Sequence, residues 1–218
     1  TAIVERYGYF GGLWTGGLVL LVISTHARTG DKRVQVVRGV GDELLQRLSR
    51  LDHAVINYGP DRINPTSDAE ATKYVMDEMT REAGVTVLLH CWAVDAVMDG
   101  RNVRGVVVES KEGRQAVLAK VVIDATGDGD VFAAAGAEHE QRLHAIGLVH
   151  LLGNVDRVSK EELAKIGGKN PRRLLGAPTP RPSVRWVNLR GPSADGLDVE
   201  TLSRLELDHR RSIWRRVE

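Results

Sequence analysis

Short apolar runs, separated by glycine-rich loops and amphipathic stretches, dominate the hydrophobic pattern of the chain. The runs at residues 2–5, 85–89 and 121–124 have the length and composition of buried strands. Each is flanked by glycine loops and helical stretches, so we expect three neighbouring strands of one parallel sheet. The pattern as a whole predicts an α/β fold.

Two amphipathic stretches in the first half of the chain are predicted to be helices. In the first, Asp42 caps a helix that runs to about Leu51 and turns its leucines inward. In the second, Ser67 and Glu70 form a capping box, and Gly84 ends the helix. Apolar side chains at steps of four predict the buried line of the second helix: Ala71, Val75, Met79 and Ala83.

The second half of the chain begins with a predicted β-meander. Strands at 93–98, 103–109 and 115–118 are separated by turns at Asp99-Gly100 and Glu112-Gly113. The run at 121–124 then leads into a glycine turn and a short helix of small residues. Beyond Gly136 we expect a second domain that contains a strand at 146–152, a short helix at 159–166, a loop at 167–182 and a last helix capped by Asp198.

Composition and charge exclude several classes of partner. The chain has 30 Lys and Arg against 29 Asp and Glu, and this balance predicts neither a nucleic-acid nor a membrane partner. The longest apolar run, 18–23, is far shorter than the ~20 residues of a membrane-spanning helix. Cys91 is the single cysteine, which excludes an intramolecular disulfide and a CxxC pair, and no leader is recognisable. We therefore expect a cytoplasmic location.

Glu5 is the first candidate for a binding role. A dinucleotide-binding βαβ unit places an acidic residue at the end of its second strand, where it accepts hydrogen bonds from ribose hydroxyls. Glu5 ends such a strand, although a glutamate there could also simply face solvent. Gly11-Gly12 and Gly16-Gly17 favour the nucleotide interpretation, because bare backbone can approach a pyrophosphate closely.

Four segments in order resemble FAD-dependent oxidoreductases of the glutathione-reductase-type dinucleotide fold, in the branch related to fumarate reductase flavoproteins. They are residues 3–12 followed by Thr15, residues 36–40, residues 74–89 and residues 121–130. The resemblance implies an incomplete Rossmann-like FAD-binding domain over 1–136, with the meander inserted in it, and a partial substrate-side helical region over 137–218. It implies an enzyme that passes hydride or electrons between FAD and a small-molecule substrate.

The resemblance also assigns roles to individual residues. It implies that Glu5 holds the ribose, that Gly11, Gly12 and Thr15 approach the pyrophosphate and flavin, and that backbone near Ala93 meets the adenine. The turn that begins at Ala125 closes over the cofactor. The implied FAD-binding residues are Glu5, Arg6, Gly11, Gly12, Thr15, Ala93, Val94, Ala125, Thr126, Gly127 and Asp128.

The sequence departs from the family pattern at both ends. No G-x-G-x-x-G turn precedes Glu5, and the C-terminal segment that completes the ribityl site is missing. By the size of a βαβ unit, about 25 residues are absent at the front. We therefore expect a fragment that binds FAD weakly and is inactive alone, with an unpaired sheet edge that favours self-association. The alternatives are an electron-transfer subunit of a larger complex and a non-catalytic interaction module.

Several residues keep two interpretations, and no catalytic residue is assigned. Asp128 and Asp130 either bond to the cofactor or cap the following helix. Trp14 either lies against the flavin or fills the core. His144 and His150 are either acid–base groups or structural. No metal site is expected, because the histidines and Cys91 lack metal-ligand spacing, and no serine-hydrolase elbow or P-loop occurs.

Overall fold

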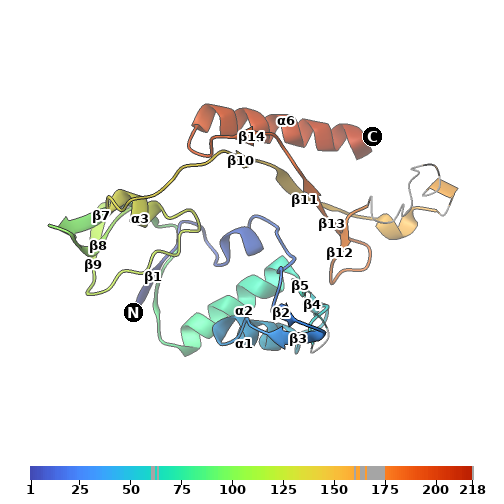
Figure 1. Cartoon of the computed structure of the whole chain (residues 1–218), viewed down its shortest axis with the longest axis horizontal. Coiled ribbons are helices and arrows are strands. Elements are labelled where there is room, and N and C mark those ends of the chain that lie inside the picture. Colours follow the sequence, from blue (N-terminus) through green and yellow to red (C-terminus); the bar gives the residue numbers. More distant parts are fainter. Residues whose placement is uncertain (60–61, 63, 160, 163–164, 166–174, 218) are drawn as a thin grey trace. The chain divides into compact units, whose positions relative to one another are not determined.

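The chain contains both helices and short sheets, as the α/β prediction requires (Figure 1). The structure, a computed structural model, describes residues 1–59, 62, 64–159, 161–162, 165 and 175–217. The chain divides into two compact units, of which the first contains 1–12 and 76–141 and the second 13–75 and 142–218. Helix α2 (Ala69–Glu82) contains the boundary between them.

Two of the three predicted parallel strands pair in the first unit. Strand β1 (Ala2–Val4) lies parallel to β6 (Thr86–Leu88), with Ile3 opposite Val87. The hydrogen bonding continues past both strands, because the Glu5 amide donates to the Leu88 carbonyl at 2.9 Å and the Cys91 amide donates to the Glu5 carbonyl at 3.0 Å. The loop after β1 is therefore held beside the segment after β6.

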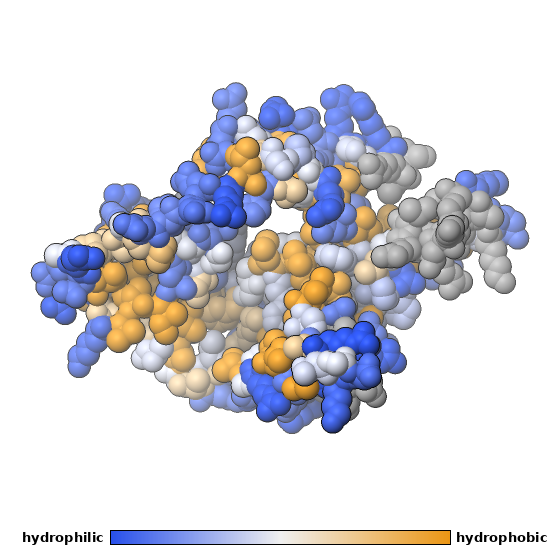
Figure 2. Space-filling model, in the orientation of Figure 1, coloured by the Kyte–Doolittle hydropathy of each residue, from blue (hydrophilic) through white to orange (hydrophobic). Residues whose placement is uncertain are grey.

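The third predicted strand, 121–124, was wrong. These residues belong to no strand in the described part of the chain, where β1 pairs with β6 alone. Val121 and Ile123 are 75% and 84% exposed, while Val122 packs against the core. Hydrophobic side chains gather on the surface near β1 (Figure 2). An apolar run becomes a strand only when a neighbour satisfies its backbone, and composition does not supply that neighbour.

The predicted meander is present in the first unit. Strands β7 (Trp92–Asp99), β8 (Asn102–Ser110) and β9 (Gly113–Leu118) pair antiparallel in that order. Gly100 and Gly113 occupy its turns with φ of 60° and 97°, a region that glycine enters without steric cost. Helix α3 (Asp130–Ala134) contacts β7 (Figure 1). The core beneath consists of Cys91, Val106, Val108 and Val131.

The second unit contains small sheets and, among its described residues, two further helices whose bounds are described in full. Its sheets are β2 (His26–Thr29) with β3 (Lys32–Gln35), β4 (Val55–Ile56) with β5 (Thr66–Ser67), β10 (His144–Ala145) with β14 (Ser193–Ala194), and β13 (Arg185–Leu189) between β11 (Leu148–Leu152) and β12 (Ala177–Pro178). The helices are α1 (Val40–Leu48) and α6 (Val199–Val217), with 3-10 turns η1 (Gly12–Trp14), at the unit boundary, and η2 (Val155–Arg157). The strand predicted at 146–152 is β11. No helix among the described residues has the length and apolarity to cross a bilayer.

The predicted start and end of the first helix were wrong. Helix α1 is preceded by Gly39, and Asp42 lies inside its first turn. The Asp42 carboxylate instead accepts hydrogen bonds from the Tyr58 hydroxyl at 2.9 Å and the Gln46 amide at 2.8 Å. Burial alone would raise the Asp42 pKa, but these hydrogen bonds hold it below its usual value. Leu51 lies beyond the helix and is 38% exposed.

Asp68, rather than Ser67, caps helix α2. One Asp68 oxygen accepts from the amides of Glu70 and Ala71, both at 3.1 Å. Ser67 lies fully buried in β5, where its hydroxyl accepts a hydrogen bond from Thr72 at 3.0 Å. The buried residues of α2 are Thr72 and Val75, so the predicted line of four was right only at Val75.

Other predicted boundaries were correct. Gly84 follows the end of α2 with φ of 61°, and Asp198 accepts the Glu200 amide at 3.1 Å to begin α6. Ser159 and Glu162 cap each other reciprocally, at 2.8 and 3.1 Å. Residues 160, 163–164 and 166–174 lie outside the described residues, as therefore do parts of the predicted helix at 159–166 and loop at 167–182.

Candidate functional site

Three segments that contain predicted binding residues emerge from one hydrophobic cluster in the first unit. Val4 precedes Glu5, Cys91 precedes Trp92, and Val122 and Val131 flank the 124–130 turn. Because all four side chains pack on the same core, the polar residues that follow them are positioned by it. The cluster thus positions the predicted residues that follow Val4 and Cys91 and those of the 124–130 turn, whereas Thr15 belongs to the second unit.

Glu5 lies at the carboxyl end of β1, as predicted. Its Oε1 accepts a hydrogen bond from the Tyr7 backbone N–H at 2.8 Å, which fixes the direction of the side chain. A carboxylate has several acceptor positions, so this single bond leaves Glu5 able to accept from ligand hydroxyls. Gly8 packs on His90, and a side chain on Gly8 would collide with that imidazole ring. The loop after Glu5 is therefore packed closely against His90.

Arg6 lies between two aromatic side chains. Its guanidinium carbon is 4.6 Å from the centroid of the Tyr7 ring and 5.0 Å from that of Trp92. Tyr7 in turn stacks on Tyr9, with centroids 5.5 Å apart and planes 4° from parallel. Trp92 remains 51% exposed. The group Arg6, Tyr7, Tyr9 and Trp92, called here the aromatic stack, presents a flat surface beside Glu5.

The glycine loop divides between the two units. Gly11 and Gly12 have φ of 103° and 48°, and a Cβ on Gly12 would meet nothing within 4 Å. The backbone at Gly12 is therefore accessible. Thr15, in the second unit, is 1% exposed, and its carbonyl accepts the Leu18 amide at 3.2 Å. Trp14 is half-buried, and its indole N–H has no partner among the described residues.

Val94 occupies a β-bulge at the start of the meander. Ala93 pairs with Val108 and Asp95 pairs with Val107, so the register skips Val94. A bulged residue is released from the regular ladder, which leaves its backbone groups for other partners. Ala93 packs against the core cluster, whereas Val94 is 37% exposed. This geometry suits the predicted backbone contact at residues 93–94.

Asp124 and Thr126 organise the turn that contains Ala125, Thr126, Gly127 and Asp128. Asp124 accepts the Thr126 amide and hydroxyl at 2.9 and 2.7 Å and the Phe132 amide at 2.8 Å. The Thr126 hydroxyl oxygen accepts the amides of Gly129 and Asp130 at 3.0 and 2.9 Å. The side chains of Asp124 and Thr126, rather than those of Asp128 and Asp130, therefore satisfy the first amides of α3.

The Asp124 carboxyl is held in its charged form. Its partial burial favours the protonated state, but hydrogen bonds from Thr126, Phe132 and Val131 outweigh that effect and keep its pKa below the usual 3.8. Gly127 and Gly129 have φ of 92° and 77°, so the turn depends on backbone conformations that other residues rarely adopt. The carboxylate and the two glycines together fix the shape of the turn.

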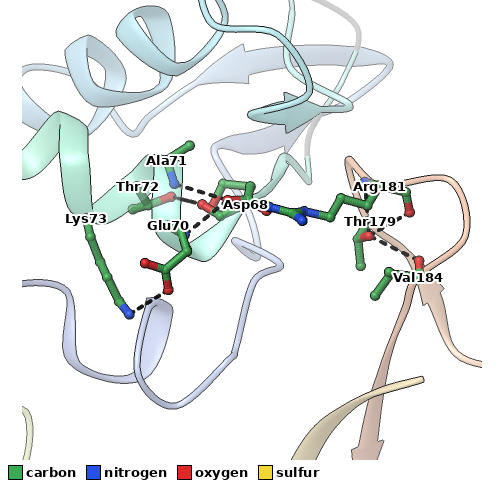
Figure 3. Close-up of polar contacts among 9 residues, drawn as sticks. Asp68, Glu70, Ala71, Thr72, Lys73, Thr179, Arg181 and Val184 are labelled. Carbon is green, nitrogen blue, oxygen red and sulfur yellow. Dashed lines mark hydrogen bonds and ion pairs between the residues drawn. The ribbon is translucent and has the colours of Figure 1, made fainter. Parts of the chain in front are cut away.

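A second polar cluster lies in the second unit, at the start of α2 (Figure 3). Arg181 points at Asp68, and their Nε and Oδ2 atoms are 3.0 Å apart. The buried Thr179 hydroxyl hydrogen-bonds the carbonyls of Arg181 and Val184, both at 3.0 Å, and so holds the Arg181 turn. An open cavity of about 510 Å³ is lined here by Asp52, His53, Asp68, Glu70, Ala71, Arg181 and Pro182.

The histidines singled out from the sequence lie in the second unit. His144 is exposed on β10, and His150 lies on β11 opposite Val187. Among the described residues, no group of three metal-binding side chains is arranged around a common point.

Sequence reasoning missed two residues and one ion pair of these clusters. Trp92 directly precedes the predicted contact at Ala93, and an aromatic in that position was a usable signal. Asp124 ends an apolar run before a glycine turn, which is typical of a side chain that organises the turn. The pairing of Arg181 with Asp68 spans 113 residues of sequence, and no local pattern predicts it.

Comparisons with known proteins give one family match and several partial structural matches. Residues 1–147 match a family model described as FAD dependent oxidoreductase. Similar solved structures include THI4 from Thermovibrio ammonificans, at 20% identity and TM-score 0.42, where the match covers 67% of this chain and 55% of that one. A flavocytochrome c3 fumarate reductase is 22% identical, with TM-score 0.27 over 37% of this chain and 16% of that one. The aromatic hydroxylase CabE is 16% identical, with TM-score 0.36 over 84% and 34%. No curated protein matches the chain.

Proposed function

We propose a flavin-linked redox function from one premise: the chain belongs to the FAD dependent oxidoreductase family, whose model matches residues 1–147. Its cofactor is FAD. In the intact protein, hydride or electrons would pass between the flavin and a small-molecule substrate. The chain spans 55% or less of the solved chains named above, so this activity is proposed for the longer protein to which it corresponds.

The residues of the first unit fit the adenosine half of FAD. Glu5 presents a carboxylate with acceptor capacity at the end of a parallel strand, which is where a ribose is held in dinucleotide folds. Val94 leaves the strand ladder close by, so its backbone groups are available to a base edge. Gly12 offers open backbone on which a Cβ would meet nothing. These three features are the observed basis for placing the cofactor here.

Each element of this site has a distinct task. Glu5 accepts from the ribose hydroxyls, and its hydrogen bond with the Tyr7 amide orients it for that purpose. The glycine backbone admits the pyrophosphate, and the 124–130 turn, shaped by Asp124, forms the wall over the cofactor. A helix N-terminus after a G-x-G-x-x-G turn usually meets the pyrophosphate, and no such turn occurs in these 218 residues, so we expect them to bind FAD weakly.

We also propose a domain division and a cellular location for the protein. We assign residues 1–136 to the FAD-binding domain and 137–218 to a substrate-side region, on the positions of the matched motifs. A cytoplasmic location rests on the single cysteine, Cys91, which is buried and unpaired by a disulfide.

The proposed FAD site depends most on Glu5, so a substitution of Glu5 tests it. Glu5→Ala is expected to weaken FAD binding about tenfold, because a charged acceptor for ribose hydroxyls is worth about 1–3 kcal/mol. Dissociation constants would be measured by flavin fluorescence titration of the unmodified and variant chains. Weak binding by the unmodified chain is expected, so the titration must extend to high protein concentration.

Glu200→Ala is the matched control, because Glu200 is an exposed glutamate on α6 in the second unit and is not one of the predicted FAD residues. It should leave FAD affinity unchanged. Equal FAD affinities for Glu5→Ala and the unmodified chain would show that Glu5 is not the ribose acceptor. Absence of FAD binding to the unmodified chain at any attainable concentration would remove the cofactor assignment for this chain.

The free edge of β1 supports a proposal of self-association. Among the described residues β1 has a hydrogen-bonded neighbour on one side only, and exposed Val121 and Ile123 follow the meander. A free strand edge and an exposed apolar run both favour pairing with other chains, and charge in them opposes it. We expect concentration-dependent association in light scattering, and we expect Val121→Lys to reduce it at least severalfold because it places a charge in the exposed run. Val199→Lys, at a position 74% exposed in α6, is the control, and equal effects of the two variants would contradict a part for the 121–123 run in the association.

A further inference from the structure

We propose that Trp92, supported by Arg6, is the surface on which the adenine ring of the cofactor stacks at this site. The inference rests on the proposed function, because it takes Glu5 as the ribose acceptor. It adds a base-stacking residue that neither the sequence motifs nor the family match identifies.

The position of Trp92 relative to Glu5 comes from backbone hydrogen bonds. The Cys91 amide donates to the Glu5 carbonyl at 3.0 Å, so Trp92 is the next residue along the segment facing Glu5. In an adenine nucleotide the base is joined directly to the ribose. A base attached to a ribose held by Glu5 must therefore lie within one sugar's length of that carboxylate, and Trp92 begins the adjoining strand β7.

The Trp92 side chain is held in place, and part of its indole is exposed to a stacking ring. The Arg6 guanidinium covers part of the indole at 5.0 Å, and the Tyr7 ring holds the guanidinium at 4.6 Å. Tyr9 stacks on Tyr7 and so braces the group. Half of Trp92 nevertheless remains exposed. An apolar ring this large, held in place yet half-exposed, offers a π-face on which a purine can stack.

The neighbouring bulge supplies the polar complement that a purine needs. Val94 has no register partner on β8, and this irregularity puts a bulged backbone segment two residues from Trp92. Adenine has both donors and acceptors on its edge, and bulged backbone can meet them while the indole covers the ring face. A nicotinamide or flavin ring, which is not attached to the ribose nearest Glu5, would not reach this position.

The test compares two ligands that contain adenine with one that lacks it. FAD, AMP and FMN would be titrated against the full 218-residue chain and against Trp92→Ala and Trp92→Phe, with binding followed by ligand-observed NMR. Trp92→Ala is expected to weaken FAD and AMP about tenfold, the effect typical of one lost base–aromatic stack, and to leave FMN unchanged. Trp92→Phe should restore most of the affinity, because it keeps an aromatic face.

Trp214→Ala is the matched control, because Trp214 is 67% exposed on α6 in the second unit. Unchanged AMP and FAD affinities in Trp92→Ala, in a chain that does bind FAD, would overturn the adenine assignment and leave the proposed function intact. An equal loss of FMN would also overturn it, since Trp92 would then face the flavin. No binding of FAD or AMP by the unmodified chain would overturn both proposals. Circular dichroism of each variant separates loss of binding from loss of fold.

Discussion

Gly105→Ala is expected to destabilise the first unit by about 3 kcal/mol or more. A methyl group on Gly105 would collide with the carbonyl oxygen of Val117 and would also press on the Leu118 backbone. These atoms belong to β9, which pairs with β8 at Gly105, so the strand ladder must open to admit the side chain. Backbone atoms cannot rotate away as a flexible side chain can. Urea unfolding followed by far-UV circular dichroism would measure the loss.

Gly153→Ala makes the same chemical change where a Cβ meets nothing within 4 Å and where φ is not positive, so it should leave stability nearly unchanged. Gly105→Ala should also weaken FAD binding, because Gly105 pairs with Val97 on β7, the strand that contains Trp92 and Val94. Equal urea unfolding midpoints for Gly105→Ala and Gly153→Ala would show that β8 and β9 can accommodate a methyl group at Gly105.

Local patterns predicted the elements whose causes are local. Gly84 ends α2 and Asp198 begins α6, because each terminus is decided by a single residue next to the helix. The meander follows from alternating side chains and two glycine turns. Glu5 could be located for the same reason, since a carboxylate at the end of a short apolar strand before a glycine loop is a contiguous pattern.

Features that depend on a distant partner could not be predicted in this way. Ser67 and Asp68 are both good caps, and the choice of Asp68 follows from the burial of Ser67 in β5 against Thr72. Residues 121–124 are as apolar as β1, yet only β1 has a strand beside it. The stacking of Arg6 on Trp92 joins residues 86 positions apart in the sequence, and only folding brings them together.

Asp124→Ala is expected to destabilise the 124–130 turn by about 2–4 kcal/mol. The carboxylate accepts hydrogen bonds from the Thr126 amide and hydroxyl and from the Phe132 amide, and these donors would lose their partner. Thr126 would then also be less well placed to satisfy the Gly129 and Asp130 amides. Hydrogen exchange at Gly129, Asp130 and Phe132 should accelerate, together with a lower free energy of unfolding. Asp128→Ala removes an exposed carboxylate from the same turn and should change neither quantity appreciably.

The pH dependence of the unfolding free energy of Asp124→Asn separates the effect of the Asp124 charge from the effect of its shape. The pKa of Asp124 in the folded chain lies below its usual value of 3.8, because the hydrogen bonds from Thr126, Phe132 and Val131 outweigh the opposing effect of burial. A lowered pKa means that the ionised group stabilises the fold above pH 3.8 and that this stabilisation is lost as the pH falls through the folded-state pKa. The difference in unfolding free energy between the unmodified chain and Asp124→Asn should therefore be greatest near neutral pH and shrink steadily below pH 3.8. A difference that is the same at neutral pH and at the acid end of the titration would mean that the Asp124 charge does not hold the turn.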